Sequence, residues 1–161
     1  MSEAPRLLSV AIPAYNEERY IATLIERIRS VDLGGLGVAA ELIVVDDCST
    51  DRTADIVAAI PGVRLIRQSR NGGKGSAVRA GIEAAVGDYL MIQDADLEYD
   101  PADYLPMLRA VIDGRAEIVY GSRYLKRPDR GPFANLWSAR HPQQSITAYI
   151  GGQSLSLIGL S

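Results

Sequence analysis

The sequence predicts an α/β fold in which a mainly parallel sheet is covered by helices on both faces. Strand patterns and helical patterns alternate about four times along the chain, and one more strand pattern follows the last helix. Polar clusters come directly after the strands, which is where parallel sheets bind their ligands. The 161 residues, 47% of them hydrophobic, are enough for one domain with a substantial core.

Five short, largely apolar runs predict the strands. Continuous apolar runs are typical of strands that are buried on both faces, as in a parallel sheet. Each run ends at a proline, a glycine or a polar side chain. The predicted strands are residues 7–12, 42–45, 63–66, 88–92 and 117–120.

Four segments carry apolar residues at helical spacing, and they predict the helices. These segments are residues 17–28, 54–60, 77–86 and 101–112. Asn16 is placed to cap the first helix, where Glu17 and Glu18 would lie near its positive end. Ser49 and Thr50 offer caps for the second helix.

Composition excludes several classes of protein. The net charge of −3 gives no basic surface for nucleic acid. The single cysteine, Cys48, excludes an internal disulfide framework and fits a reducing compartment, so we expect a cytoplasmic location. The first six residues lack the basic start and apolar core of a signal peptide. The sequence also contains no run of about 18 apolar residues, which is the length needed to span a membrane.

The stretch "IQDADLEYDP" (92–101) places four carboxylates at alternate positions after a predicted buried strand. Asp94 and Asp96 begin in a partly desolvated place, where paired carboxylates are costly without a cation. Clustered carboxylate oxygens suit Mg²⁺ or Mn²⁺ that also holds substrate phosphates, and Glu98 would complete the set. Asp100, directly before a proline, fits a charge at a helix N-terminus.

Two further clusters follow the second and third strands. Asp46 and Asp47 are placed to accept hydrogen bonds from a base and a ribose, although capping of the next helix explains Asp47 equally well. The loop "RNGGKGS" is able to wrap an anion with backbone N–H groups and Lys74. It is not a P-loop, because Lys74 is followed by glycine, and Val78 breaks the dinucleotide fingerprint.

In this order, the motifs resemble those of family-two glycosyltransferases with the Rossmann-like GT-A fold. The chain is most similar to the polyprenyl-phosphate (dolichyl-phosphate) mannosyl- or glucosyltransferase branch. The matching stretches are "VAIPAYNEE" (10–18), "ELIVVDDCSTDRT" (41–53), "NGGKGSAVRAGIEAAVGDYLMIQDADLEYDP" (71–101) and "IVYGSRY" (118–124). The acidic run is the DxD motif of this family.

The resemblance implies roles for individual residues. Pro13, Tyr15 and Glu17 line the nucleotide pocket, Asp46 contacts the nucleoside, and Lys74 approaches that pocket.

The resemblance also implies a cation site and catalytic residues. Asp94 and Asp96 bind a divalent cation, Mg²⁺ or Mn²⁺, together with the diphosphate, and Glu98 is a further metal or water ligand. Arg123 faces the phosphates or the acceptor. Asp96 and Arg123 are the catalytic candidates.

The implied reaction is inverting transfer of a hexose from GDP-mannose or UDP-glucose to a polyprenyl phosphate. The cation neutralises the diphosphate leaving group. Two alternatives remain open at this point: a family-two transferase with a polysaccharide or soluble acceptor, and a nucleotide-sugar-binding module that needs a further segment for activity.

Residues 1–125 are expected to form the donor-binding core, and residues 126–161 an incomplete acceptor-side segment. Lys126, Arg127 and Arg130 would steer two anions together, unless they only solvate a loop. An interfacial helix is expected to place the protein on the cytoplasmic membrane face, with a core helix as the alternative. Its residues would be Trp137, Tyr149, Ile150, Leu155, Leu157 and Ile158.

Two expectations concern the end of the chain. The family continues with an acceptor-side acidic and aromatic motif and often with membrane helices, so we expect a C-terminally truncated protein. Apolar surface exposed by truncation leads to the hypothesis of a homo-oligomer. His141, the only histidine, fits an ordinary surface residue better than a catalytic base.

Overall fold

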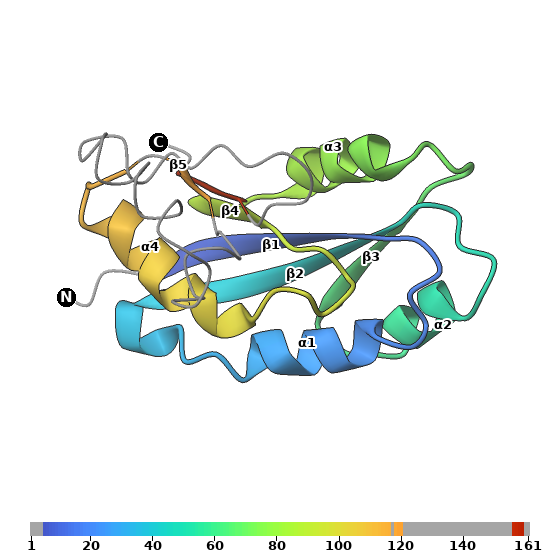
Figure 1. Ribbon diagram of the computed structural model, residues 1–161, viewed down its shortest axis with the longest axis horizontal. Coiled ribbons are helices and arrows are strands. Elements are labelled where there is room, and N and C mark those ends of the chain that lie inside the picture. Colours follow the sequence, from blue (N-terminus) through green and yellow to red (C-terminus); the bar gives the residue numbers. More distant parts are fainter. Residues whose placement is uncertain (1–4, 117, 121–155, 160–161) are drawn as a thin grey trace, which may run out of the picture.

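A six-stranded sheet in the order β3-β2-β1-β4-β6-β5 forms the centre of the protein (Figure 1). The computed structural model describes residues 5–116, 118–120 and 156–159. Strands β1 to β4 are parallel, whereas β6 runs antiparallel to both β4 and β5. The strands are β1 (Arg6–Ala14), β2 (Val38–Asp46), β3 (Val63–Arg67), β4 (Tyr89–Ile92), β5 (Ile118–Tyr120) and β6 (Ser156–Gly159).

Helices cover both faces of this sheet, as the sequence predicted. Helix α3 lies on one face, and α1, α2 and α4 lie on the other (Figure 1). Alternating residues of β1 point toward opposite faces of the sheet. Leu8, Val10 and Ile12 pack in the hydrophobic cluster with α1 and α4, whereas Ala11 faces α3. The helices are α1 (Ile21–Arg29), α2 (Thr53–Ala58), α3 (Lys74–Ala84) and α4 (Tyr104–Ile112), with 3₁₀ turns η1 (Gly34–Leu36) and η2 (Pro101–Asp103).

Helix α1 begins later than predicted, and the side chains predicted to cap α1 and α2 do not cap them. Helix α1 begins at Ile21, and Asn16 adopts a left-handed φ of 57° instead of capping it. Helix α2 begins at Thr53, whose N–H donates to Asp51 Oδ1 at 2.9 Å. The predicted caps are used elsewhere, in contacts between the loops that follow β1 and β2. Asp100 does act as predicted, because its side chain accepts the N–H of Ala102 at 3.0 Å.

Strand β6 corrects the prediction of an interfacial helix at the end of the chain. Leu157 and Ile158 lie in a strand that is inserted between β4 and β5. In this position the backbone of β6 forms hydrogen bonds with a neighbouring strand on each side. A short apolar run fits a buried strand as well as a helix, so its sequence pattern alone does not distinguish the two. Residues 156–159 are therefore part of the core sheet. The other residues named for the helix lie outside the described part of the chain.

The register of β6 fixes where the chain leaves and rejoins the sheet. Ser156 pairs with Tyr120 of β5 and with Ile92 of β4. Both partners lie at the carboxyl ends of their strands, so the chain leaves and re-enters the sheet at the same edge. This is also the edge that carries the loops after β1, β2 and β4. Among the helices of the described residues, none has the length and apolarity needed to cross a bilayer.

A buried polar contact fastens the opposite edge of the sheet. Ser9 of β1 is fully buried, donates its hydroxyl to Glu41 of β2 and accepts the N–H of Gly87 at 2.8 Å. Glu41 also accepts the N–H of Val86 at 3.0 Å. A Cβ on Gly87 would come within 2.6 Å of the Leu7 carbonyl oxygen. The backbone of β1 therefore leaves room only for glycine at position 87.

Gly87→Ala is expected to destabilise the protein by about 2–4 kcal/mol, because a β-strand would have to move to admit the methyl group. Urea unfolding measures this free energy. Gly75→Ala is the matched control, since a Cβ at position 75 in α3 meets nothing within 4 Å. The control should be neutral or slightly stabilising. Equal stability of the two variants would contradict the close approach at Gly87.

Candidate functional site

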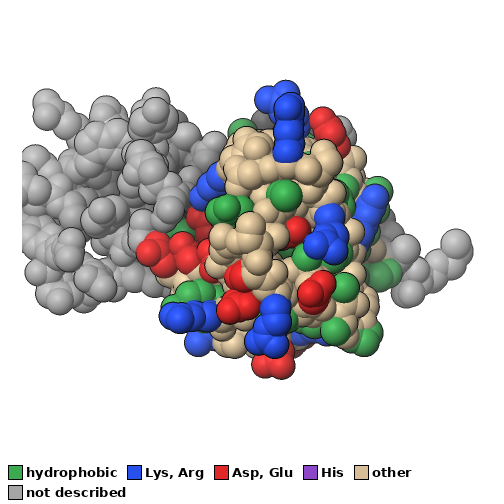
Figure 2. All heavy atoms as spheres, turned by 90° about the vertical axis from the view of Figure 1, so that its right-hand side faces the viewer, with side chains coloured by type: hydrophobic (Ala, Val, Ile, Leu, Met, Phe, Trp, Pro, Cys, Tyr) green, Lys and Arg blue, Asp and Glu red, His purple; other side chains and the backbone are tan. Residues whose placement is uncertain are grey.

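A cavity of about 410 Å³ lies at the carboxyl edge of the parallel strands. It brings together side chains from the loops that follow β1, β2, β3 and β4. Figure 2 looks onto this edge and shows acidic and basic side chains side by side on it. Most of the residues predicted for the site line the cavity: Pro13, Tyr15, Glu17, Asp47, Lys74, Asp94 and Asp96.

Asp94 is a buried carboxylate of this cavity, with an exposed fraction of only 7%. Its Oδ1 lies 2.7 Å from Nζ of Lys74, which is half-exposed. Its Oδ2 is buried and finds no hydrogen-bond donor among the described residues. A buried carboxylate oxygen without a donor is costly, so this oxygen is placed to receive a ligand.

The carboxylates of the cavity fit a divalent cation that is shared with a substrate. Asp94 and Asp96 offer hard oxygen ligands, which Mg²⁺ and Mn²⁺ prefer. The described residues contain no group of three or more acidic, histidine or cysteine side chains that would hold a metal by themselves. Mg²⁺ is commonly bound by one or two carboxylates together with substrate phosphates, so this arrangement suits a cation that arrives with its substrate.

Glu98 is not brought to Asp94 and Asp96, contrary to the alternate spacing in the sequence. Its side chain lines a different cavity, beside Arg27. The reason is Leu97, whose left-handed φ of 60° turns the chain directly after Asp96. The Glu98 N–H then donates to Asp96 Oδ1 at 3.1 Å. Asp94 and Asp96 therefore share a cavity that the Glu98 side chain does not line.

Asp47 fixes the glycine loop and does not cap helix α2. Its two carboxylate oxygens accept the N–H groups of Gly72 and Gly73, each at 2.8 Å. These two amides were predicted to wrap an anion, and the structure shows them donating to Asp47 instead. Gly73 has a left-handed φ of 79° and directly precedes α3, so Asp47 also orients the start of that helix.

Asp46 is 1% exposed, and its side chain is not part of the cavity lining. It accepts the N–H of Ser49 at 3.3 Å and lies 3.9 Å from Nε of Arg67. Contact of this side chain with a nucleoside stays a prediction. Arg123, like Lys126, Arg127, Arg130 and His141, lies outside the residues that the structure describes.

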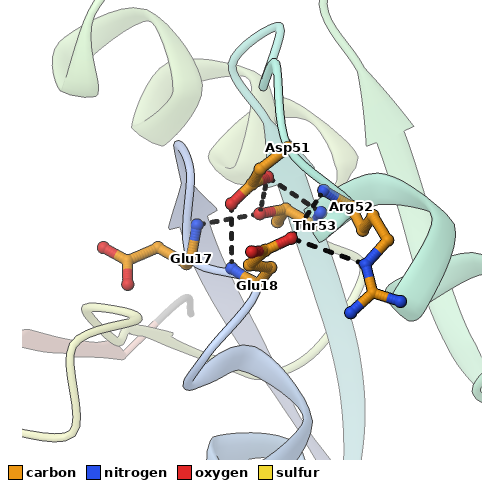
Figure 3. A network of polar contacts seen from close by, with 5 residues as sticks. All are labelled: Glu17, Glu18, Asp51, Arg52 and Thr53. Carbon is orange, nitrogen blue, oxygen red and sulfur yellow. Dashed lines mark hydrogen bonds and ion pairs between the residues drawn. The ribbon is translucent and has the colours of Figure 1, made fainter.

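Glu17 adds a further carboxylate to the cavity, beside those of Asp47, Asp94 and Asp96, from the loop after β1. Burial raises its pKa above the ordinary 4.5, and the negative charges of Asp96, Asp51 and Asp94 raise it further. Figure 3 shows its carboxylate pointing away from the polar network that holds its backbone. Glu17 is thus held among like charges, which is a position that a bound cation or a hydrogen-bond donor would relieve.

Glu17→Gln is expected to raise the unfolding free energy at pH 7.5, in EDTA, by about 0.5 kcal/mol, a small value because the half-exposed carboxyl is screened. A raised pKa means that folding disfavours the ionised form, so the wild type regains this stability as the pH falls through the raised pKa toward 4.5. Thermal unfolding of both proteins at pH 7.5 and 4.5 measures the difference. A gain of equal size at both pH values would contradict the assignment.

Sequence reasoning missed a buried hydrogen-bond chain behind Asp94. The hydroxyl of Tyr104 in α4 donates to Gln93 Oε1 at 2.8 Å, and Gln93 Nε2 donates to the backbone oxygen of Asp94 at 2.9 Å. Burial raises the pKa of Tyr104, so its hydroxyl remains a neutral donor. Tyr104 was predicted only as part of an apolar helix face. The available signal was Gln93, a polar residue at the end of a buried strand.

Comparison with known proteins agrees with this geometry. The model of glycosyl transferase family 2 matches residues 9–159. The chain is 38% identical over 122 residues to a dolichol-phosphate mannosyltransferase of Pyrococcus furiosus, covering 74% of this chain and 34% of that protein. It is 41% identical over 106 residues to an undecaprenyl-phosphate 4-deoxy-4-formamido-L-arabinose transferase of Pectobacterium carotovorum, covering 63% of this chain and 32% of that protein. The chain thus spans about a third of the length of these curated relatives.

A solved structure gives the same result for the fold. Glucosyl-3-phosphoglycerate synthase from Mycobacterium tuberculosis, in complex with Mn²⁺, uridine diphosphate and phosphoglyceric acid, superposes with a TM-score of 0.66 at 27% identity. The match covers 97% of this chain and 56% of that one. The fold is the GT-A fold that the resemblance implied. Because the family model covers most of its length, the chain belongs to glycosyl transferase family 2.

Proposed function

We propose that the protein is a metal-dependent, inverting glycosyltransferase that moves a hexose from a nucleotide sugar to a polyprenyl phosphate. The observation that carries this proposal is Asp94, with one carboxylate oxygen on Lys74 and the other buried without a donor among the described residues. A divalent cation that arrives with the donor would supply the missing partner of that oxygen. Asp96 and Glu17 lie in the same cavity and make it attractive to a cation.

The donor occupies the cavity at the carboxyl edge of the sheet in this proposal. Pro13 and Tyr15 line the nucleotide side, with Asp46 contacting the nucleoside as the family resemblance implies. Asp94 and Asp96 would hold Mg²⁺ or Mn²⁺ together with the diphosphate, and Lys74 would add a positive charge beside it. When bound, the cation acts as a Lewis acid that stabilises the charge developing on the leaving diphosphate.

The acceptor phosphate attacks the anomeric carbon from the face opposite the diphosphate. A new bond forms between the anomeric carbon and a phosphate oxygen, and the bond to the nucleoside diphosphate breaks with inversion. Because a phosphate monoester is already largely anionic near neutral pH, no strong general base is needed. Arg123 remains the proposed contact that faces the phosphates or the acceptor.

Two relatives named for dolichol phosphate and undecaprenyl phosphate support a polyprenyl acceptor. Peripheral contact with the cytoplasmic membrane face would bring the enzyme to such a lipid. The structural neighbour in complex with phosphoglyceric acid supports the alternative of a soluble acceptor. The partitioning of the labelled product between an organic phase and water distinguishes the two.

Calorimetric titration with GDP-mannose and with UDP-glucose, each in Mn²⁺ and in EDTA, tests the proposal on the present chain. We expect one of the donors to bind, and only when Mn²⁺ is present. Binding that persists in EDTA would contradict the cation's role. The absence of binding by either donor would overturn the assignment of this cavity to a nucleotide sugar.

A further inference from the structure

The loops after β1 and β2 are joined by hydrogen bonds in which each loop both donates and accepts. None of these bonds takes part in the proposed reaction. Three consecutive backbone N–H groups of the first loop each donate to a side chain of the second loop or of the first residue of α2. These bonds run from Asn16 to Ser49 Oγ at 2.9 Å, from Glu17 to Thr53 Oγ1 at 2.8 Å and from Glu18 to Asp51 Oδ2 at 3.1 Å.

The second loop returns the contact in the same manner. Asn16 Oδ1 accepts the N–H of Thr50 at 2.9 Å, and Glu18 Oε2 accepts the N–H of Arg52 at 3.1 Å. The side chains at positions 16 and 18 are thus committed to the neighbouring loop. The carboxylate of Glu17, between them, points away from the network (Figure 3) and lines the cavity.

Thr53 is the centre of this arrangement. It is fully buried, and its hydroxyl donates to Asp51 Oδ1 at 2.5 Å while it accepts the N–H of Glu17. Asp51 Oδ1 also accepts the backbone N–H of Thr53 at 2.9 Å. Because the hydroxyl hydrogen is directed at Asp51, a lone pair of Thr53 Oγ1 is free to receive Glu17 N–H.

The network acts against electrostatic repulsion. Asp94 and Asp96 face the same cavity as Glu17, and Asp51 is near it, so like charges push the Glu17 carboxylate toward solvent. A loop of this kind, if held only by its own backbone, would relax by moving the carboxylate out of the cavity. Fixing the backbone N–H on either side of the side chain opposes that movement.

We propose that Thr53, supported by Asp51, is a positioning residue that keeps the Glu17 carboxylate in the cavity, where it accepts hydrogen bonds from O–H or N–H groups of the nucleotide-sugar donor. This inference rests on the proposed donor-binding function and adds a specific pair of residues to it. Thr53 itself is buried and does not line the cavity. Its effect on the donor therefore passes through Glu17.

Two substitutions of Thr53 distinguish the effect of its hydroxyl group from the effect of its side-chain shape. Thr53→Val keeps the branched side chain and removes the hydroxyl, whereas Thr53→Ser keeps the hydroxyl. Thr23→Val is the matched control, because it makes the same chemical change on an exposed position of α1. Glu17→Gln and the double variant with Thr53→Val complete a double-mutant cycle.

Hydrogen exchange of the amides at 16–18, without donor, is the first readout. Thr53→Val should accelerate exchange at Glu17 about tenfold or more, with Thr53→Ser and Thr23→Val close to wild type. Donor titration in Mn²⁺ is the second readout. Thr53→Val should weaken donor binding about tenfold, Thr53→Ser by threefold or less, and the double variant should bind no more weakly than Glu17→Gln alone.

The outcomes separate the positioning role from the proposed function. Unchanged exchange in Thr53→Val, or additive losses in the double variant, would overturn the positioning role, because Thr53 would then act independently of Glu17. Wild-type donor affinity in Thr53→Val would overturn it as well. A wild-type chain that binds neither donor instead overturns the proposed function, and the donor-contact part of this inference with it.

Discussion

Asp94→Asn is expected to weaken cation-dependent donor binding about 100-fold or more. The substitution keeps the shape of the side chain but removes a negative charge from a position that is 7% exposed. In the wild type, Asp94 Oδ1 lies 2.7 Å from Nζ of Lys74, and the substitution replaces this charged carboxylate with an uncharged amide. A hard divalent cation loses its most confined ligand, and in a desolvated site that interaction is strong.

Calorimetry with the preferred donor, and electron paramagnetic resonance of free Mn²⁺, measure this loss. Glu98→Gln is the matched control, because it removes a carboxylate of the same acidic run whose side chain lines a different cavity. We expect the control to bind Mn²⁺ and donor within about twofold of wild type. If both variants lost the cation equally, the geometry that separates Glu98 from Asp94 would be wrong.

Lys74→Met is expected to change two affinities in opposite directions. Without donor, Lys74 neutralises Asp94 and competes with a divalent cation for it, so its removal should tighten Mn²⁺ binding about threefold; the gain is modest because Lys74 is half-exposed. With donor, the diphosphate loses a neighbouring positive charge, and donor affinity should fall about 10- to 30-fold.

Arg79→Met controls for net charge, since it removes a cation from an exposed position of the same helix. Its effect on both affinities should be below twofold at physiological salt. A loss of both Mn²⁺ and donor affinity in Lys74→Met would mean that the lysine supports the site without competing for it. Unchanged donor affinity would remove Lys74 from the donor site.

The sequence predicted the layers of the fold and the edge that carries the site, because both depend on local periodicity and on the direction of parallel strands. Asp94, Asp96, Lys74 and Glu17, all predicted for this edge, line one cavity there. Glu98 lines a different cavity, because a single left-handed residue, Leu97, turns the chain in a stretch whose spacing looks extended.

Contacts between distant segments could not be predicted from local pattern. Asp47 is 25 and 26 residues from the two glycines that it holds, and nothing in the sequence joins them. Thr53 was missed for the same reason, since its partner is 36 residues away. The position of β6 could not be predicted either, because it depends on the space between β4 and β5, which local sequence pattern does not reveal.

The pairing of Ser156 with Tyr120 has a consequence for how this protein family can diversify. Two neighbouring strands fix the ends of the intervening stretch, so the entropy of closing it depends only weakly on its length: a doubling costs about 0.6 kcal/mol. A longer chain between these two anchors therefore adds little to the entropic cost of forming the sheet. The same pairing of β5 with β6 is therefore compatible with different lengths of chain between Tyr120 and Ser156.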